Sequence, residues 1–98
     1  MSGFAVELAP DVEGEVGSAF LWYFERNPIA ADAFRFEVFA GIDAIAENPE
    51  LYAVDEDGIR RCVLDHFPYS LHYEITGNTV TVLAVAHHSR SPGYWHDR

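Results

Sequence analysis

The sequence contains no lysine, and its six basic residues, all arginine, are outnumbered by sixteen acidic ones, which gives a formal net charge of −10. This composition excludes a broad basic surface that follows a nucleic-acid backbone, because such surfaces depend on clustered lysine and arginine. Any nucleic-acid contact must be local, and we expect no sequence-specific DNA binding by this chain alone. The acidic excess instead favours attraction of a basic protein partner at long range.

Cysteine and long apolar runs are also scarce. The single cysteine, Cys62, excludes an intrachain disulfide and argues against a thiolate zinc site. Its neighbours are typical of a strand, so we expect a buried side chain rather than a reactive thiol. No segment approaches the roughly 18 apolar residues of a membrane span. Glu7 and Asp11 interrupt the first apolar run and no basic residue precedes it, so we expect no signal peptide and a cytoplasmic protein without membrane contact.

The apolar and aromatic content is high enough for one hydrophobic core. Hydrophobic residues make up 49% of the 98 residues and aromatic residues 14%. A chain of this length forms a single domain, here residues 1–98, and its aromatic side chains partly offset the small size of the core.

The first half of the chain has one strand-like and two helix-like segments. Residues 3–8 alternate weakly, which predicts a strand. Pro10, followed by acidic residues, is typical of a helix start, and apolar side chains then recur every three or four positions. Asn27-Pro28 ends this helix because the residue before proline is disfavoured in helices. A second helix is predicted over about 30–48, antiparallel to the first.

The second half predicts three strands after an acidic loop over residues 49–58. The strands cover 59–64, 69–75 and 80–86, and Gly77-Asn78 forms a two-residue turn between the last two. Residues 80–86 are apolar on both faces, which predicts a central strand. The predicted fold class is therefore α+β, with the element order β-α-α-β-β-β.

Three motifs resemble the RelE/ParE toxins of bacterial type II toxin–antitoxin systems, which are also called plasmid stabilisation proteins. They are R-R-x-x-L-x-x-F-P-Y-x-L-x-Y at 60–73, V-x-V-L-A-V-A-H at 80–87 and R-x-P-G-Y-W-x-x-R at 90–98. The Trp22-Tyr23 pair, Phe36 and Ile45-Ala46-x-x-Pro49 agree with the same family. The resemblance implies a helical hairpin packed on one face of a twisted, mostly antiparallel four-stranded sheet.

The resemblance also implies a partner and a choice of two targets. The partner is a cognate antitoxin whose flexible C-terminal part wraps the toxin and silences it. RelE-like members cleave messenger RNA on the ribosome, whereas ParE-like members poison DNA gyrase and lack the nuclease residues. Whether the chain is an enzyme therefore depends on the branch, and no cofactor is expected in either.

RNA cleavage without a metal needs a base, an acid and cations that stabilise the charged transition state. The family resemblance makes Arg61, Arg90 and Tyr94 the catalytic candidates if the chain is RelE-like. However, Ser70 stands where the cleaving enzymes commonly carry arginine, and the sequence has no lysine to help. We therefore favour gyrase inhibition over messenger RNA cleavage, and a third hypothesis is a non-toxic, partner-binding module that retains the toxin fold.

The arginines around the last hairpin are candidates for binding the target or the antitoxin, together with one tryptophan. Adjacent strand residues face apart, so we expect one of Arg60 and Arg61 to pair with an acidic side chain and the other to face outward. We predict no metal site, because His87 and His88 would point to opposite faces of a strand. The candidate binding residues are Arg60, Arg61, Arg90, Trp95 and Arg98.

Overall fold

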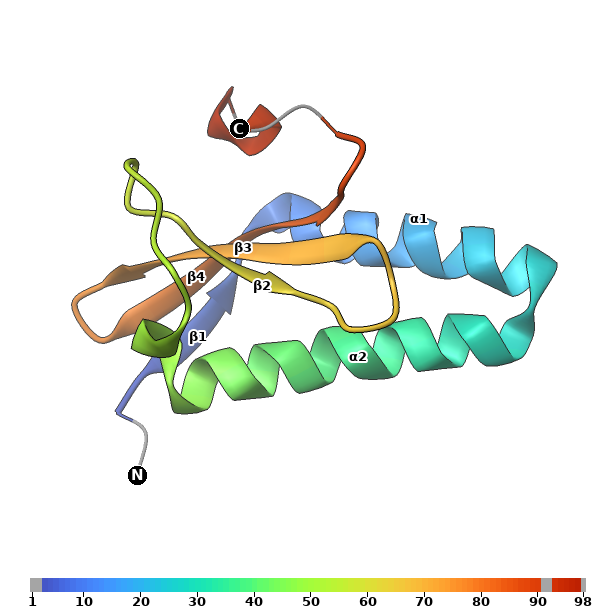
Figure 1. Ribbon diagram of the computed structural model, residues 1–98, viewed down its shortest axis with the longest axis horizontal. Helices are drawn as coiled ribbons and strands as arrows, with labels where there is room; N and C mark the ends of the chain where they lie inside the picture. The colour runs from blue at the N-terminus through green and yellow to red at the C-terminus, as the bar shows by residue number, and fades with distance from the viewer. Residues whose placement is uncertain (1–2, 91–92, 98) are drawn as a thin grey trace.

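Two helices and a four-stranded sheet form the fold shown in Figure 1. The computed structural model describes residues 3–90 and 93–97. Its elements are β1 (Ala5–Leu8), α1 (Pro10–Arg26), α2 (Pro28–Glu47), the 3-10 turn η1 (Pro49–Leu51), β2 (Arg60–Val63), β3 (Tyr69–Thr76), β4 (Thr79–His87) and the 3-10 turn η2 (Tyr94–Asp97). The expected α+β class and the order β-α-α-β-β-β are confirmed.

The strands lie in the order β1-β4-β3-β2, with β1 parallel to β4 and the other neighbours antiparallel. The apolar segment that predicted a central strand is β4, which pairs on both sides. Gly77 and Asn78 form the two-residue turn between β3 and β4. Gly77 has a φ of 60°, a conformation that glycine adopts without a steric penalty.

An irregularity in β4 explains why this strand does not alternate. Val82 pairs with Tyr73, but the next paired residue of β4, Ala84, lies opposite His72, so Leu83 is an extra residue in a β-bulge. The bulge reverses the alternation of the strand. Val82 before it and Val85 after it therefore both face the helices, while Ala84 faces the other side of the sheet.

The two helices are joined by Asn27 alone. Its backbone N–H donates to the Tyr23 carbonyl at the end of α1, while its side-chain oxygen accepts from the N–H groups of Ile29 and Ala30. The prediction that α2 begins near residue 30 is thus wrong by two residues. Pro28 takes the first helical position, where its missing N–H leaves no bond unmade.

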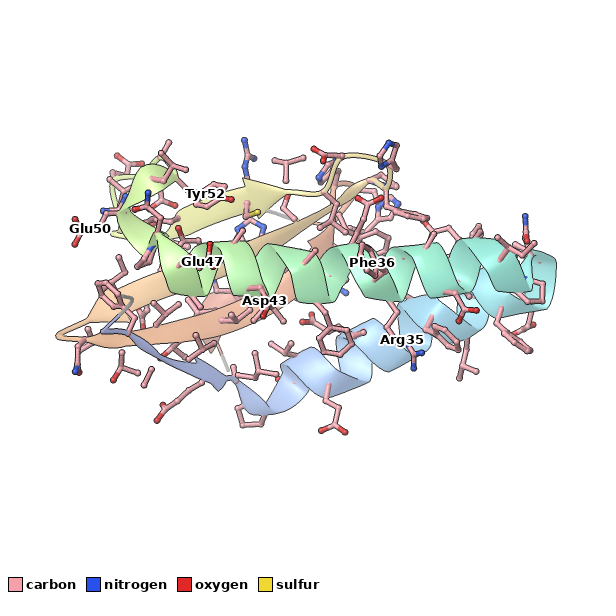
Figure 2. All side chains as sticks on the ribbon, turned by 90° about the horizontal axis from the view of Figure 1, so that it is seen from below. Arg35, Phe36, Asp43, Glu47, Glu50 and Tyr52 are labelled. Atoms are coloured by element: carbon pink, nitrogen blue, oxygen red, sulfur yellow. The ribbon has the colours of Figure 1, made fainter. Side chains whose placement is uncertain are left out.

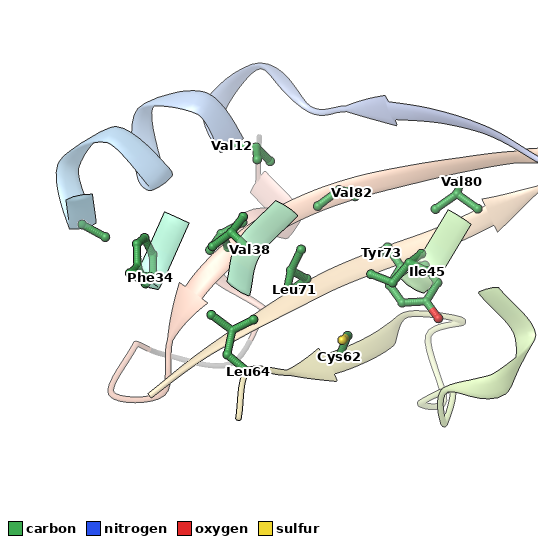
Figure 3. Packing of buried hydrophobic residues seen from close by; sticks show 12 residues of the cluster. Val12, Phe34, Val38, Ile45, Cys62, Leu64, Leu71, Tyr73, Val80 and Val82 are labelled. Atoms are coloured by element: carbon green, nitrogen blue, oxygen red, sulfur yellow. The ribbon is translucent and has the colours of Figure 1, made fainter. Parts of the chain in front are cut away.

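The core lies between the helical hairpin and the sheet, as Figure 3 shows. Phe34, Val38 and Ile45 of α2 are fully buried against side chains of the sheet. Gly41 lets α2 approach the sheet closely, since a Cβ atom here would lie 3.1 Å from Leu71 Cδ1. Cys62 is buried as expected, and burial raises the pKa of its thiol. The helices cover one face of the sheet and leave the other available for a site.

Candidate functional site

A cleft of about 970 Å³ opens on the sheet face opposite the helices. One wall is the loop of residues 53–57. The other is the C-terminal tail, defined here as the described residues after β4, 88–90 and 93–97. Figure 1 shows this loop and the tail rising on the same side of the sheet, away from α2. This cavity is called the sheet-face cleft below.

The loop wall is acidic, and the side chain of Asp55 holds its turn in place by hydrogen bonds to the backbone. Asp55 Oδ1 accepts hydrogen bonds from the backbone N–H groups of Asp57 (2.8 Å) and Ile59 (2.9 Å), and Gly58 turns the chain with a φ of 81°. Asp55, Glu56 and Asp57 are all exposed. The turn therefore presents three carboxylates along one side of the sheet-face cleft.

The floor carries small and polar side chains. Ser70 is buried, and its Oγ lies 2.8 Å from His88 Nε2, a hydrogen bond that joins β3 to the start of the tail. Ala86 lies opposite Ser70 in the sheet and is also buried. Arg61 enters from the edge strand β2 and remains exposed. The floor is thus open above β2 and covered near the tail.

His72 and Trp95 form an aromatic pair inside the cleft. Their ring centroids are 4.1 Å apart and the ring planes are inclined by 32°. Burial, with a further contribution from the positive charge of Arg61, lowers the pKa of His72 to about 4. The imidazole is therefore neutral at pH 7, and its uncharged ring face lies against the Trp95 ring.

The tail is held by contacts with α1 and with its own arginine. The Tyr94 hydroxyl donates to Glu15 Oε2, and Glu15 Oε1 accepts from the Val85 N–H of β4 at 3.0 Å. The Arg90 guanidinium carbon lies 3.9 Å from the centroid of the Tyr94 ring, a cation–π contact. The phenol of Tyr94 is therefore engaged on its oxygen and on its ring.

The structure brings three of the predicted binding residues together with the catalytic candidate Tyr94, and it places Arg60 apart from them. Arg61, Arg90, Tyr94 and Trp95 all line the sheet-face cleft. Arg60 faces the opposite side, where its Nη1 atom donates to two carbonyls of the turn after α2, 2.6 Å from Tyr52 O and 3.2 Å from Glu50 O.

The surroundings of Arg60 differ from the prediction. An acidic partner was expected for one of the pair, and for Arg60 this is wrong: two backbone carbonyls bind it instead. The reason is its register opposite Tyr73, which directs its side chain to the turn after α2. Arg98, which is also a predicted binding residue, lies outside the described residues.

Sequence reasoning missed Glu15 and the Ser70–His88 pair as parts of this site. Glu15 is one of the acidic residues that follow Pro10, and nothing in its local sequence indicates a contact with residues 70 and 79 positions away. His88 was considered as part of a strand, but β4 ends at His87, whose Nδ1 accepts from the Ser89 N–H. The contacts of Glu15 and the Ser70–His88 hydrogen bond become apparent only once the strands are paired and the tail is in place.

The charged side chains that line the cleft are of both signs. Among its described lining residues are three carboxylates, from Asp55, Glu56 and Asp57, and two guanidinium groups, from Arg61 and Arg90. A phosphate here would meet the acidic wall, whereas RNA cleavage needs net positive charge around the transition state. In the described part of the chain, no three His, Cys, Asp or Glu side chains are placed to hold a metal ion.

A second surface lies on the helical hairpin. An apolar groove of about 410 Å³ runs between α1 and α2 and is called the hairpin groove here. Figure 2 views the molecule from this side and shows Arg35 between the helices and Phe36 on α2. Phe36 is 74% exposed and Phe39, which lines the groove, 54%. The groove is lined by Leu8, Val12, Glu13, Val16, Gly17, Phe20, Arg35, Val38, Phe39 and Ile42.

Exposed apolar side chains of this size are typical of surfaces that another protein covers. Neither helix in the described part of the chain is both long and apolar enough to cross a membrane.

Comparisons with known proteins agree with the fold and with the resemblance found in the sequence. Residues 6–92 match the family model described as "ParE toxin of type II toxin-antitoxin system, parDE". A solved structure described as "Chromosomal ParDE TA system from P. aeruginosa" superposes with a TM-score of 0.76 at 14% identity and covers 89% of this chain and 98% of its own. The comparison with curated protein sequences gave no match. Because the family model spans most of the chain, the protein belongs to the ParE toxin family of type II toxin–antitoxin systems, and its partner is a cognate antitoxin.

Proposed function

We propose that this chain inhibits DNA gyrase through the sheet-face cleft and its C-terminal tail, and that it does not cleave messenger RNA. The observation that carries the proposal is the state of Tyr94, the residue that an RNA-cleaving relative would use. Its hydroxyl donates to the carboxylate of Glu15, and its ring is covered by Arg90. A phenol bound to a carboxylate, in a cleft whose other wall is acidic, is poorly placed to meet a phosphate.

The rest of the cleft supports the same choice. Arg61 is its exposed cation on β2, Ser70 is bound to His88, and His72 is neutral at pH 7 because of its lowered pKa. Aromatic and arginine side chains are, in contrast, the residues that most often dominate protein–protein contacts. The tail supplies both kinds, with the aromatic residues Tyr94 and Trp95 and with Arg90. A gyrase target also implies that the chain acts in the cytoplasm.

The test is a pair of assays on the unmutated chain. After induction without antitoxin, labelled thymidine incorporation should fall before labelled methionine incorporation, and purified chain should inhibit DNA supercoiling by gyrase. Arg61→Ala should weaken the inhibition, whereas the matched control Arg35→Ala, on the helical side, should leave it unchanged. Methionine falling first, or specific RNA cleavage, would overturn the proposal, as would soluble protein that affects neither label.

We further propose that the antitoxin covers the hairpin groove. The proposal is supported by its apolar lining and by the exposed Phe39, which a stable partner would shield from water. Phe39→Asp should abolish neutralisation by the antitoxin while gyrase inhibition persists. Leu51→Asp is the matched control, because Leu51 is 70% exposed but lies outside the groove. Equal neutralisation of both variants would contradict this placement.

A further inference from the structure

The edge of the central strand is incompletely covered by β1. The pairing of β1 with β4 ends at Leu8 opposite Val82, and Ala9 N–H then donates to the Val82 carbonyl at 2.8 Å as the chain turns into α1. β4 continues to His87. Its next edge residues need another partner, because unpaired backbone N–H groups at a buried edge are costly.

Glu15 supplies that partner from α1. Its Oε1 atom accepts from the Val85 N–H at 3.0 Å, in the place where a neighbouring strand would offer a carbonyl. Its Oε2 atom accepts from the Tyr94 hydroxyl. One carboxylate thus joins three segments that are distant in sequence: the second turn of α1, the middle of the sheet and the tail.

The contact with Tyr94 places the rest of the tail. Arg90 lies over the Tyr94 ring at 3.9 Å, and the Trp95 ring meets the same ring edge-on at a centroid distance of 5.2 Å. Trp95 in turn stacks on His72 at 4.1 Å. Glu15 therefore fixes Tyr94, and Tyr94 in turn contacts the Arg90 and Trp95 side chains that line the cleft.

We infer that Glu15 is a positioning residue for target binding, which holds the tail against β4 so that Arg90 and Trp95 face the partner in one fixed arrangement. The inference rests on the proposed function for the identity of that partner. The position of the tail itself is testable without any target. Fixing these side chains before binding reduces the conformational entropy that association would otherwise cost.

Two substitutions separate the roles of the carboxylate. Tyr94→Phe removes only the hydroxyl and leaves the bond between Glu15 and the Val85 N–H in place. Glu15→Ala removes both bonds. Glu13→Gln is the matched control, since Glu13 lies on the same helix, is exposed, and lines the hairpin groove instead of contacting the tail.

The structural readout is the accessibility of Trp95. The chain has two tryptophans, so a Trp22→Phe background leaves Trp95 as the sole indole fluorophore. Acrylamide quenching should rise severalfold in Tyr94→Phe and Glu15→Ala, because loss of a charge-assisted hydrogen bond changes the ratio of released to held tail about tenfold or more. Hydrogen exchange at the Val85 amide should accelerate in Glu15→Ala but not in Tyr94→Phe. Glu13→Gln should resemble the unmutated background in both measurements.

The functional readout is inhibition of gyrase supercoiling by the same proteins. Both tail variants should need a severalfold higher concentration for half inhibition, at a urea midpoint that Tyr94→Phe barely changes. Unchanged quenching in both variants would overturn the inference, and so would a released Trp95 with undiminished inhibition. If the unmutated chain does not inhibit gyrase, the proposed function fails, while quenching and amide exchange still decide whether Glu15 positions the tail.

Discussion

Removing the hydroxyl of Tyr73 tests how the turn before the acidic wall is fixed. Tyr73 is fully buried, and its hydroxyl donates to the carbonyl of the buried Pro49 at 2.6 Å. Tyr73→Phe leaves that carbonyl without its partner at nearly unchanged side-chain volume. The expected cost is about 1–3 kcal/mol, the range for a buried polar group left unsatisfied.

This cost should be measurable by urea denaturation and by thermal unfolding. For a domain of this size, about 2 kcal/mol lowers the melting temperature by roughly 8–16 °C and the urea midpoint by about 1 M at an unchanged slope. Tyr23→Phe is the control, because Tyr23 is only half-buried and belongs to the aromatic cluster with Phe34. It should lose clearly less stability.

The same substitution has a signature at alkaline pH. Burial, opposed in part by the charge of Arg60, raises the pKa of Tyr73 to about 12 from the ordinary value of about 10. The folded chain therefore holds this proton between these values while the unfolded chain loses it, so the unfolding free energy falls as pH rises from about 10 through 12. Tyr73→Phe should lack this part of the decline. Equal urea midpoints at neutral pH, or identical alkaline declines, would refute the reasoning.

Three further predictions concern other parts of the structure. Glu37→Ala should lower the unfolding free energy measured by urea denaturation by about 1–3 kcal/mol, because Glu37 accepts from two backbone N–H groups of the β2–β3 loop and from His66 Nδ1. His66→Ala should cost less than about 1 kcal/mol, because the His66 side chain is exposed. Equal costs of the two substitutions would contradict this assignment. Because the pKa of His72 is lowered, the unfolding free energy should fall as pH falls from about 6.5 to about 4. In Trp95→Ala, the pKa of His72 measured by NMR titration should rise toward the ordinary value. An unchanged pKa would mean that Trp95 does not bury the imidazole. Asn27→Ala should cost about 1 kcal/mol by loss of the α2 cap, and an unchanged urea midpoint would show that the cap contributes nothing.

The sequence predicted helix ends and turns well where proline or glycine restricts the backbone of the neighbouring residues. Asn27-Pro28 marked the boundary between the helices, because proline restricts the residue before it, yet the start of α2 was placed too late. Asn27 is both the C-cap of α1 and the N-cap of α2. A turn signal in the sequence does not indicate that one residue caps both helices. The turn at Gly77 was predicted correctly because its positive φ is a local requirement that glycine meets.

The family motifs, rather than the turn and helix signals, indicated part of the candidate site. The motifs singled out Arg61, Arg90, Tyr94 and Trp95, and the sheet brings all four to one cleft. They did not indicate that Arg60 would turn to backbone carbonyls on the other face, since that depends on the turn after α2 lying beside β2.

The sequence by itself determined the order of the elements, the central place of the apolar strand and the membership of the ParE toxin family, because periodicity, turn residues and motifs are properties of neighbouring positions. Only the tertiary structure decided the role of Glu15, the bulge at Leu83 and the neutral state of His72. Each of these depends on segments separated by many residues along the chain. Their contacts form only when the strands pair and the tail crosses the sheet.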